Sequence, residues 1–322
     1  MAHLTSSNVH NDKILANLLI GWRFDDFVWE EVSGKIKTDG RESDEYITLN
    51  KKNNLSKDAG VIAPGDPSPI KGLGISKDSF TMNEYAISTF LADRTIKNAD
   101  APLKQQLRNA AAVSVMDDVQ RKMEFDVAAA VFDTSIWDTD ITGSTTTDDA
   151  THRIQWNDYN SSTPVDDFID GKSVIRKATA KKANRALIND DVWDALQRNP
   201  EILVCLGAQE RGFVTIDMFA QFLGLDKVVL GSTSYDSSNE SATDPTITGI
   251  WGKNALLYYY TPKPQMLDTA SVLTFEAQPV EVRRWREDNS VHRKVEFVEA
   301  SVIQGYKIVD SGLGYFWDGI VA

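Results

Sequence analysis

The chain has 322 residues, of which 42% are hydrophobic and 25% are charged, and its formal net charge at pH 7 is −13. These values exclude a disordered chain and are typical of a globular protein with a sizeable core, in one large or two interleaved domains. The acidic balance argues against a protein that grips duplex DNA, because such binding needs clustered Lys and Arg. We therefore expect any DNA to be a neighbour and not a ligand.

Cysteine use and hydropathy indicate the cellular setting. The single Cys205 cannot form an intrachain disulfide, and its place between Val204 and Leu206 predicts a small buried hydrophobic residue rather than a reactive thiolate. The start of the chain lacks the basic and apolar segments of a signal peptide, and no window reaches the roughly 20 apolar residues of a membrane span. We expect a soluble protein that is made in the cytoplasm.

The first 80 residues lack a core of their own. Residues 1–32 combine a polar start with a short apolar patch at 14–22, and they predict an arm that packs on another element. Residues 33–80 are rich in Lys, Asp, Asn, Gly and Ser, with short alternating pieces that indicate weak strands. Three prolines within residues 64–69 remove amide donors and favour an exposed turn. This segment predicts a long projecting hairpin that a neighbour stabilises.

The strongest pattern predicts one long helix over residues 100–133. Asp100 can cap this helix, and Pro102 lies in the first turn, where its missing N–H does no harm. Apolar residues then recur at every fourth position, at Leu103, Leu107, Ala111, Val115, Val119, Met123, Val127 and Val131. A helix of this length spans ~45 Å, and the row winds around it, so that no single flat partner can cover it. We interpret it as the spine of an elongated subunit; an ordinary core helix is the alternative.

The remainder predicts a mixed layer followed by a β-rich end. Residues 134–152 have the Ser, Thr, Asp and Gly content of a linker. Helices are expected at 166–180, 190–196 and 215–223, and short strands at 185–188 and 227–231. Further strands are expected at 249–260, 280–286 and 293–308, the last two joined by a turn at 288–290. These elements predict an α/β layer and a long β hairpin.

No pattern indicates a catalytic, cofactor-binding or metal site, so we expect no enzyme. The four histidines, His3, His10, His152 and His292, are scattered through polar sequence and are interpreted as surface residues. The chain has no nucleophile elbow, no P-loop and no GxGxxG between a strand and a helix. The two glycines of the GxG at 72–74 are interpreted as residues that give the backbone of the projecting segment conformational freedom.

Three clusters have both a structural and a functional interpretation. The acids Asp138, Asp140, Asp148 and Asp149 could hold a hard cation, but their spacing matches no calcium loop and favours a solvated loop. The run Tyr258 to Tyr260 predicts packing on both faces of a strand, with ligand stacking as the alternative. The basic residues Arg283, Arg284 and Arg286 beside two acids predict ion pairs between subunits.

The order of arm, projecting hairpin, long helix, α/β layer and long β hairpin resembles the major capsid proteins of tailed bacteriophages, whose fold is called Hong Kong 97-like. Individual strings are similar too: residues 63–80, 83–86, 93–103, 137–143, 156–159, 189–202, 251–256 and 312–317. The resemblance covers about residues 30–322. It rests on loose strings, because the family has no short invariant motif.

This resemblance implies an α+β Hong Kong 97-like capsid fold whose parts have known roles. They would be an N-terminal arm at 1–32, an extended loop at 33–80 that lies over an adjacent subunit, a peripheral domain at 81–154 and 261–308 with the spine helix at 100–133, and an axial domain at 155–260 and 309–322. Some members carry an N-terminal scaffolding segment that is cleaved off, and we expect none here because the polar start is short. Some members crosslink neighbours covalently, but no Lys, Asn and Glu set can be assigned to this role here.

The function that the resemblance implies is self-assembly, as hexamers and pentamers, into the icosahedral shell of a tailed phage. The partners would be copies of this chain, a portal, scaffolding and decoration proteins, and double-stranded DNA as a non-specific neighbour in the lumen, with no membrane. The protein would reside in the virion after synthesis in the host cytoplasm. Two rivals are an encapsulin-like nanocompartment shell that encloses cargo enzymes and a hydrolase built on residues 155–260, which lacks a catalytic constellation.

Overall fold

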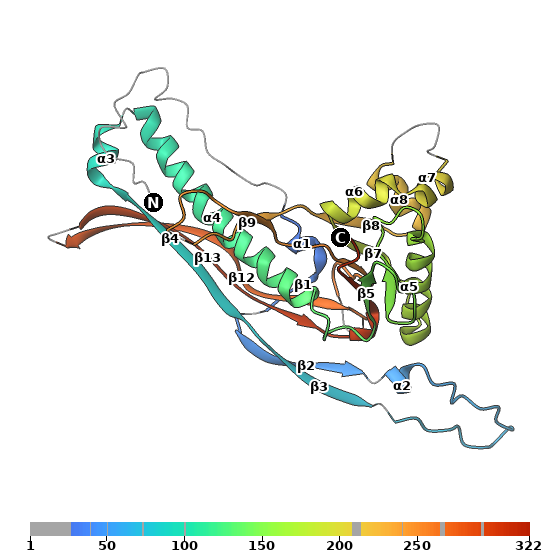
Figure 1. Ribbon diagram of the computed structural model, residues 1–322. Helices are drawn as coiled ribbons and strands as arrows, with labels where there is room; N and C mark the ends of the chain where they lie inside the picture. Colours follow the sequence, from blue (N-terminus) through green and yellow to red (C-terminus); the bar gives the residue numbers. More distant parts are fainter. Residues whose placement is uncertain are drawn as a thin grey trace.

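The computed structural model describes residues 27–322 except 39, 50, 73, 100, 208–213, 240, 265–267 and 291–292. The arm expected at 1–32 therefore lies outside the described residues up to residue 26. Figure 1 shows an elongated molecule in which a long helix, α4, lies along one β-sheet and reaches a second sheet that carries further helices. The mixed α+β class predicted from the sequence is confirmed.

The first sheet has four strands in the order β1 (Gly34–Lys37), β12 (Val272–Ser290), β13 (Arg293–Ile308) and β4 (Asn83–Ala92). The predicted long hairpin is β12 and β13, but β12 begins at Val272 instead of residue 280 and runs through the turn expected at 288–290. Register shifts on both sides of Gln278 mark irregularities next to Pro279, which cannot donate to a ladder. Because these irregularities break the alternation of apolar and polar residues, the sequence pattern did not predict the first part of β12.

Helix α4 (Ala101–Val131) is the predicted spine helix, and it packs on β13 and β4. All eight residues of its apolar row are buried, at 9% exposure or less. The row changes partners along its length, as its winding requires. Its middle packs on Val298, Ala300 and Val302 of β13, and the same core continues to Trp251 and Phe316 beside the second sheet. The helix therefore joins the two sheets through one continuous core.

The second sheet has six strands in the order β6 (His152–Ile154), β5 (Asp140–Ser144), β14 (Gly314–Asp318), β11 (Ala255–Tyr258), β7 (Arg185–Asn189) and β8 (Lys227–Gly231). Helices α5 (Pro164–Thr179), α6 (Asp190–Arg198), α7 (Pro200–Cys205) and α8 (Ile216–Leu223) accompany this sheet (Figure 1). Successive strand residues alternate between two cores: Ala186 and Ile188 join the core that includes α5 to α8, whereas Leu187 joins the core of α4. The predicted α/β layer is thus confirmed.

Two sequence interpretations in this layer were wrong. Residues 134–152 are not only a linker, because β5 pairs with β14 and buries Ile141 within a polar run. The strand expected at 249–260 is broken: β10 (Ile247–Gly249) pairs with β9 (Ser234–Asp236), and a turn with Gly252 at φ +58° precedes β11. At both places the structure depends on pairing with a distant strand and on the burial of one or two side chains. Local composition does not reveal either.

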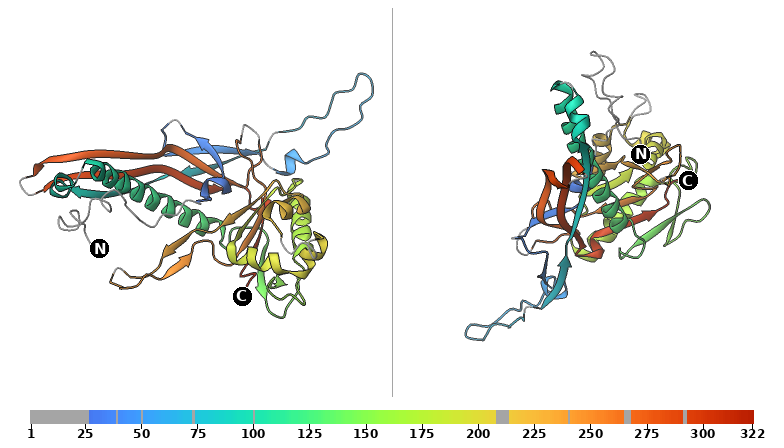
Figure 2. Two further views of the ribbon diagram at one scale, coloured as in Figure 1. Left: turned by 90° about the horizontal axis from the view of Figure 1, so that it is seen from above. Right: turned by 90° about the vertical axis from the view of Figure 1, so that its left-hand side faces the viewer.

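The remaining elements lie toward the ends of the long sheet. Helix α1 (Trp29–Val32) precedes β1, helix α3 (Asp93–Asn98) joins β4 to α4, and the 3-10 helix η2 (Ser311–Leu313) precedes β14. Strands β2 (Ser43–Leu49) and β3 (Ile75–Thr81) form an antiparallel pair, with the short helix α2 (Lys51–Asn54) following β2. Figure 2 shows this pair extending into a loop that projects from the body. The hairpin expected within 33–80 is confirmed.

Candidate assembly surfaces

The projecting hairpin is fixed at its root by a small apolar core. The ring of Phe80 stacks on Phe275 of β12 with centroids 3.9 Å apart and an angle of 4°, and Tyr46 packs on the same ring at 5.8 Å. Two ion pairs add to this root: Lys307 to Asp78 at 3.1 Å, and Lys51 to Asp310 at 2.5 Å. Because these contacts come from the body of the same chain, the direction of the hairpin is set before any neighbour binds.

Asp78 joins the hairpin to the body. It accepts a hydrogen bond from the Tyr46 hydroxyl at 2.8 Å and one from Lys307, and these two contacts, the first being the larger cause, lower the pKa of the carboxyl. The carboxylate is therefore charged throughout the neutral range. Since this site is exposed to solvent, the contacts orient the hairpin more than they stabilise the fold.

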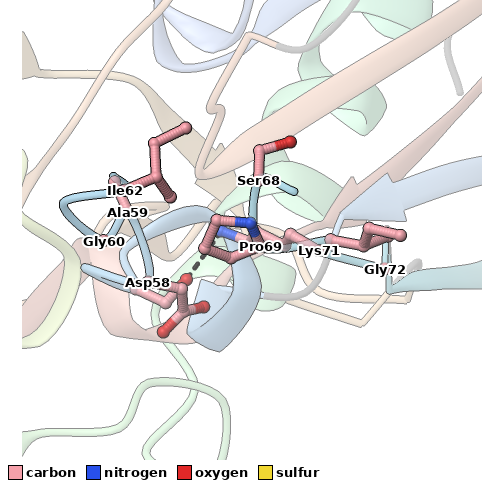
Figure 3. A pocket seen from close by; sticks show the side chains of 10 residues that line it. Asp58, Ala59, Gly60, Ile62, Ser68, Pro69, Lys71 and Gly72 are labelled. Carbon is pink, nitrogen blue, oxygen red and sulfur yellow. Dashed lines mark hydrogen bonds between the residues drawn. The ribbon is translucent and has the colours of Figure 1, made fainter. Parts of the chain in front are cut away.

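Beyond its root the loop exposes four large apolar side chains among polar ones. Val61, Ile62, Ile70 and Leu55 are 106%, 49%, 99% and 57% exposed. Figure 3 shows the two limbs of the loop, with Ile62 on one and Pro69 on the other, around an open hollow of about 710 Å³. The limbs are tied by a hydrogen bond of 2.6 Å from Lys71 to Ser56. Large apolar side chains in a projecting segment usually mark an interaction surface.

A second exposed surface is a row of three aromatic side chains across the long sheet, which we call the aromatic row. Trp285 of β12 lies opposite Phe297 of β13, which lies opposite Phe90 of β4. The ring centroids are 5.5 Å and 6.5 Å apart. Val298 points toward α4, so Phe297 points to the other face of the sheet. Trp285 is 42% and Phe90 51% exposed on this face.

A buried carboxylate joins three segments at the centre of the molecule. Glu124 of α4 is 0% exposed, and its Oε2 accepts the backbone N–H groups of Val28 and Trp29 at 3.0 and 2.8 Å. Its Oε1 accepts the hydroxyl of Thr233 at 3.0 Å and the indole N–H of Trp251 at 2.6 Å. Burial raises the pKa of Glu124, and the four donors act in the opposite direction. The side chain holds α1 and the start of the β9 segment on the spine helix.

The residues singled out in the sequence do not converge on a reactive site. His152 is bound to Asp149 at 3.1 Å on the surface, while His3, His10 and His292 lie outside the described residues. Asp148 pairs with Arg153, and Asp138 accepts the hydroxyl of Ser311. Within the described ranges, no three His, Cys, Asp or Glu side chains gather as a metal site requires. Among the helices described, none is long and apolar enough to span a membrane.

Cys205 was wrongly predicted to be buried. It is the last residue of α7 and is exposed, whereas Ile202 is the buried residue of this short helix. The tyrosine run behaves as packing: Tyr258 is fully buried, and the guanidinium of Arg185 lies 3.4 Å over the ring of Tyr260.

The arginines that were expected to form pairs between subunits have partners in their own chain. Arg283 pairs with Glu281 at 3.5 Å, Arg284 with Glu296 at 3.7 Å, and Arg286 with Asp93. Pairing between subunits remains a prediction. Sequence reasoning missed Glu124 and the aromatic row. The available signal for the first was a Glu that directly follows Met123 of the apolar row.

Comparison with solved structures assigns this fold. A phage-related protein from Bordetella bronchiseptica RB50 matches with a TM-score of 0.66 and 17% identity, over 93% of this chain and 94% of that chain. The capsid of cyanophage P-SCSP1u matches with a TM-score of 0.59 and 12% identity, over 98% and 95%. A virus-like particle from Pyrococcus furiosus matches with a TM-score of 0.52 and 10% identity, over 89% and 90%. No protein-family model and no curated protein matches the sequence.

These matches extend over nearly the whole length of both partners. The chain therefore has the fold of phage capsid proteins, the Hong Kong 97-like fold, as the resemblance predicted. At these low identities the likeness defines the fold alone, and the function is argued separately.

Proposed function

We propose that this protein is the major capsid protein of a tailed bacteriophage, a non-enzymatic subunit that assembles as hexamers and pentamers into an icosahedral shell around double-stranded DNA. The observation that carries the proposal is the likeness of almost the entire chain to the capsid of a cyanophage. The exposed apolar loop adds support, because a monomer gains nothing from projecting such a segment into water.

The parts of the fold suggest roles in this shell. We assign residues 1–32 as the arm, 33–80 as the extended loop that lies over an adjacent subunit, and 81–154 with 261–308 as the peripheral domain. Residues 155–260 with 309–322 would form the axial domain at five-fold and six-fold positions. Strands β5 and β6 fall within 81–154 but pair in the six-stranded sheet, so we move residues 140–154 from the peripheral to the axial domain.

The extended loop is the part whose removal tests its role most directly. Replacing residues 50–74 with a two-residue Asn-Gly turn would close β2 and β3 beyond the pair Leu49 and Ile75 as a short hairpin. This keeps the aromatic root at Phe80 and removes only the surface ion pair of Lys51. We expect a folded subunit with unchanged thermal unfolding and no shell. Normal shells from this variant would show that the loop does not clamp neighbours.

Packaged DNA would be a non-specific neighbour of this acidic wall. The net charge of −13 disfavours tight binding to phosphate, which helps a genome to slide during packaging and ejection. We expect purified subunits to leave duplex DNA unbound at about 0.15 M salt in a gel-shift assay. Tight binding would contradict this part of the proposal.

An encapsulin-like nanocompartment that encloses cargo enzymes is the second candidate, and the likeness to a virus-like particle from Pyrococcus furiosus favours it. Electron microscopy of the protein, expressed alone and with the genes beside its own, distinguishes the candidates. Shells filled with DNA, together with portal, scaffolding or decoration proteins, support the virion; shells filled with protein support the nanocompartment. Compact monomers under all conditions would contradict both.

A further inference from the structure

A run of cations without acids begins in the middle of helix α5. From Gly171 to Asn189 the chain contains six Lys and Arg residues and no Asp or Glu, although acids outnumber bases by 47 to 34 in the whole sequence. Five of these cations form what we call the basic face: Lys172, Arg176, Lys177, Lys181 and Lys182. The first of them is half-buried, and the other four are exposed.

The end of α5 gathers these cations at one place. The helix ends at Ala180, which adopts the left-handed conformation with φ +57°. A reversal of this kind folds the chain against the helix end, so the next two residues, Lys181 and Lys182, lie near the last turn. Burial, and to a smaller degree the ammonium of Lys182, lowers the pKa of Lys172. These two ammonium groups therefore lie close enough to repel each other.

The four exposed cations of the basic face have no acidic partner. Among the described residues, none of the four takes part in an ion pair, whereas the next lysine along the chain, Lys227, pairs with Glu31 at 2.6 Å. Cations in the last turn of a helix complement its dipole, which accounts for Arg176 and Lys177. The dipole does not account for the two lysines beyond the helix end, so the face has charge that the chain itself leaves uncompensated.

Two exposed apolar side chains border the basic face. Ile169 of α5 is 54% exposed, and it lies on the same side of the helix as Lys172 and Arg176, three and seven residues further on. Figure 1 shows α5 at the right-hand edge of the second sheet with α8 beside it. Phe222 of α8 is 41% exposed and directly precedes Leu223, whose carbonyl accepts the ammonium of Lys172. A surface of this composition fits a segment that combines carboxylates with an apolar side chain.

We propose that the basic face binds a short acidic segment of another protein, in which several Asp or Glu side chains surround one apolar anchor. The carboxylates pair with the exposed cations, and the anchor lies on Ile169. Duplex DNA fits less well, because it extends beyond five cations and would also meet exposed acids such as Asp170. The inference goes beyond the proposed function, because it assigns a surface for a second kind of protein and does not require a shell.

Fluorescence anisotropy with a defined probe tests this binding. The probe is a labelled peptide built from Glu-Glu-Leu repeats, and its neutral counterpart has Gln in place of every Glu. Full-length subunits at about 0.05 M salt should bind the acidic peptide saturably and should not bind the neutral one, and about 0.3 M salt should weaken the binding strongly.

Two pairs of substitutions separate the basic face from the overall charge. Lys181→Glu with Lys182→Glu should weaken the binding of the acidic peptide at least about tenfold. The matched control is Lys263→Glu with Lys294→Glu, which changes the net charge by the same amount at two exposed positions outside the face. Because salt screens distant charges, this control should keep its affinity within about twofold of the unmodified subunit.

Substitution of the apolar neighbour gives an independent measurement. Ile169→Ser should weaken the binding about fivefold, because the anchor loses its apolar contact. Val174→Ser is the control: Val174 is 37% exposed on the same helix but lies about 140° around the axis from Ile169. An unchanged affinity of Ile169→Ser would overturn the position assigned to the anchor.

The outcomes separate this inference from the proposed function. Absence of saturable binding, equal binding of the neutral peptide, or an equal loss in the control pair of lysines overturns it. Displacement of the peptide by a DNA oligonucleotide of the same charge assigns the face to nucleic acid, and loss of shells in the Lys181→Glu, Lys182→Glu variant without peptide binding by the unmodified subunit assigns it to a second copy. Both results overturn the acidic segment. All of them leave the shell proposal standing, which fails only if the unmodified protein forms no particles under any condition.

Discussion

Replacing Glu124 by glutamine tests whether one buried carboxylate holds the centre of the fold together. The substitution keeps the size and shape of the side chain but replaces one oxygen by an NH₂ group. Since both oxygens of Glu124 accept two hydrogen bonds each, the amide nitrogen must face two donors, either the backbone pair of Val28 and Trp29 or the pair from Thr233 and Trp251. The Thr233 hydroxyl can turn to accept a hydrogen bond from the amide, which favours the second orientation, and only the indole N–H of Trp251 then loses its acceptor.

The expected loss follows from this one donor. A buried donor left without a partner costs about 1–3 kcal/mol. Burial raises the pKa of Glu124 despite the four hydrogen bonds, so the native protein at pH 7 bears a desolvation cost that glutamine removes. We therefore expect the free energy of unfolding to fall by about 1 kcal/mol, near the lower end of that range.

Denaturant unfolding of subunits in which the Asn-Gly turn replaces residues 50–74 measures this loss without interference from assembly. Two local signals should accompany it: a change in the fluorescence of the buried Trp251 and faster hydrogen exchange at the amides of Val28 and Trp29. Asp118→Asn is the control, since Asp118 lies on the same helix with 43% of its side chain exposed and should change stability by less than about 0.5 kcal/mol. Stability equal to that of the native protein, with unchanged exchange, would refute the argument.

Three further outcomes are expected. Gly314→Ala should destabilise the fold by about 1–3 kcal/mol or more in thermal unfolding, because its Cβ would lie 2.1 Å from the ring of Trp137, whereas Gly249→Ala meets nothing within 4 Å and serves as the control. Burial, with the nearby acids as a smaller cause, raises the pKa of Asp140 from 3.8 to about 6, so its contribution to stability is present below pH 4 and is lost as the pH rises through 6. Asp140→Asn should therefore match the native protein at pH 4 and exceed it at pH 7, while Asp133→Asn should lower stability at pH 7, because hydrogen bonds from Ser135 lower the pKa of Asp133. Cys205 should react with a maleimide in the folded subunit as fast as a free thiol, and slow labelling would contradict its exposure.

Elements whose stability depends on local pattern could be predicted from the sequence. The row of α4 was identified because every fourth residue is apolar over eight repeats, and all of these residues are buried. The helix after Asn189 was identified from its cap, and the Asn189 side chain accepts the backbone N–H of Asp190. The end of α8 was identified from Gly224, which adopts φ +63°. In each case the residues that decide the structure are neighbours in the chain.

Elements that depend on distant partners could not be predicted in this way. Strand β5 forms in a polar run because β14, far along the chain, pairs with it and buries Ile141. The four donors around Glu124 come from residues 28, 29, 233 and 251, and no local pattern brings them together. The aromatic row requires the register of three strands, which the bulges in β12 shift. The sequence therefore predicted the order of the elements, but the exposed surfaces could be identified only from the strand register in the structure.

The placement of apolar residues in this chain separates a stable body from parts that need a partner. The two large cores include Trp251, Trp317 and the whole middle of α4, so the body has ample buried apolar surface to fold alone. The loop has only its root at Phe80 and Phe275, and beyond that root it exposes Val61 and Ile70 almost completely. A projecting segment of this kind gains its apolar contacts only when another copy supplies them. Stability of the body and affinity between copies are therefore encoded in different residues, and substitutions at the loop tip should alter assembly without altering the unfolding of the subunit.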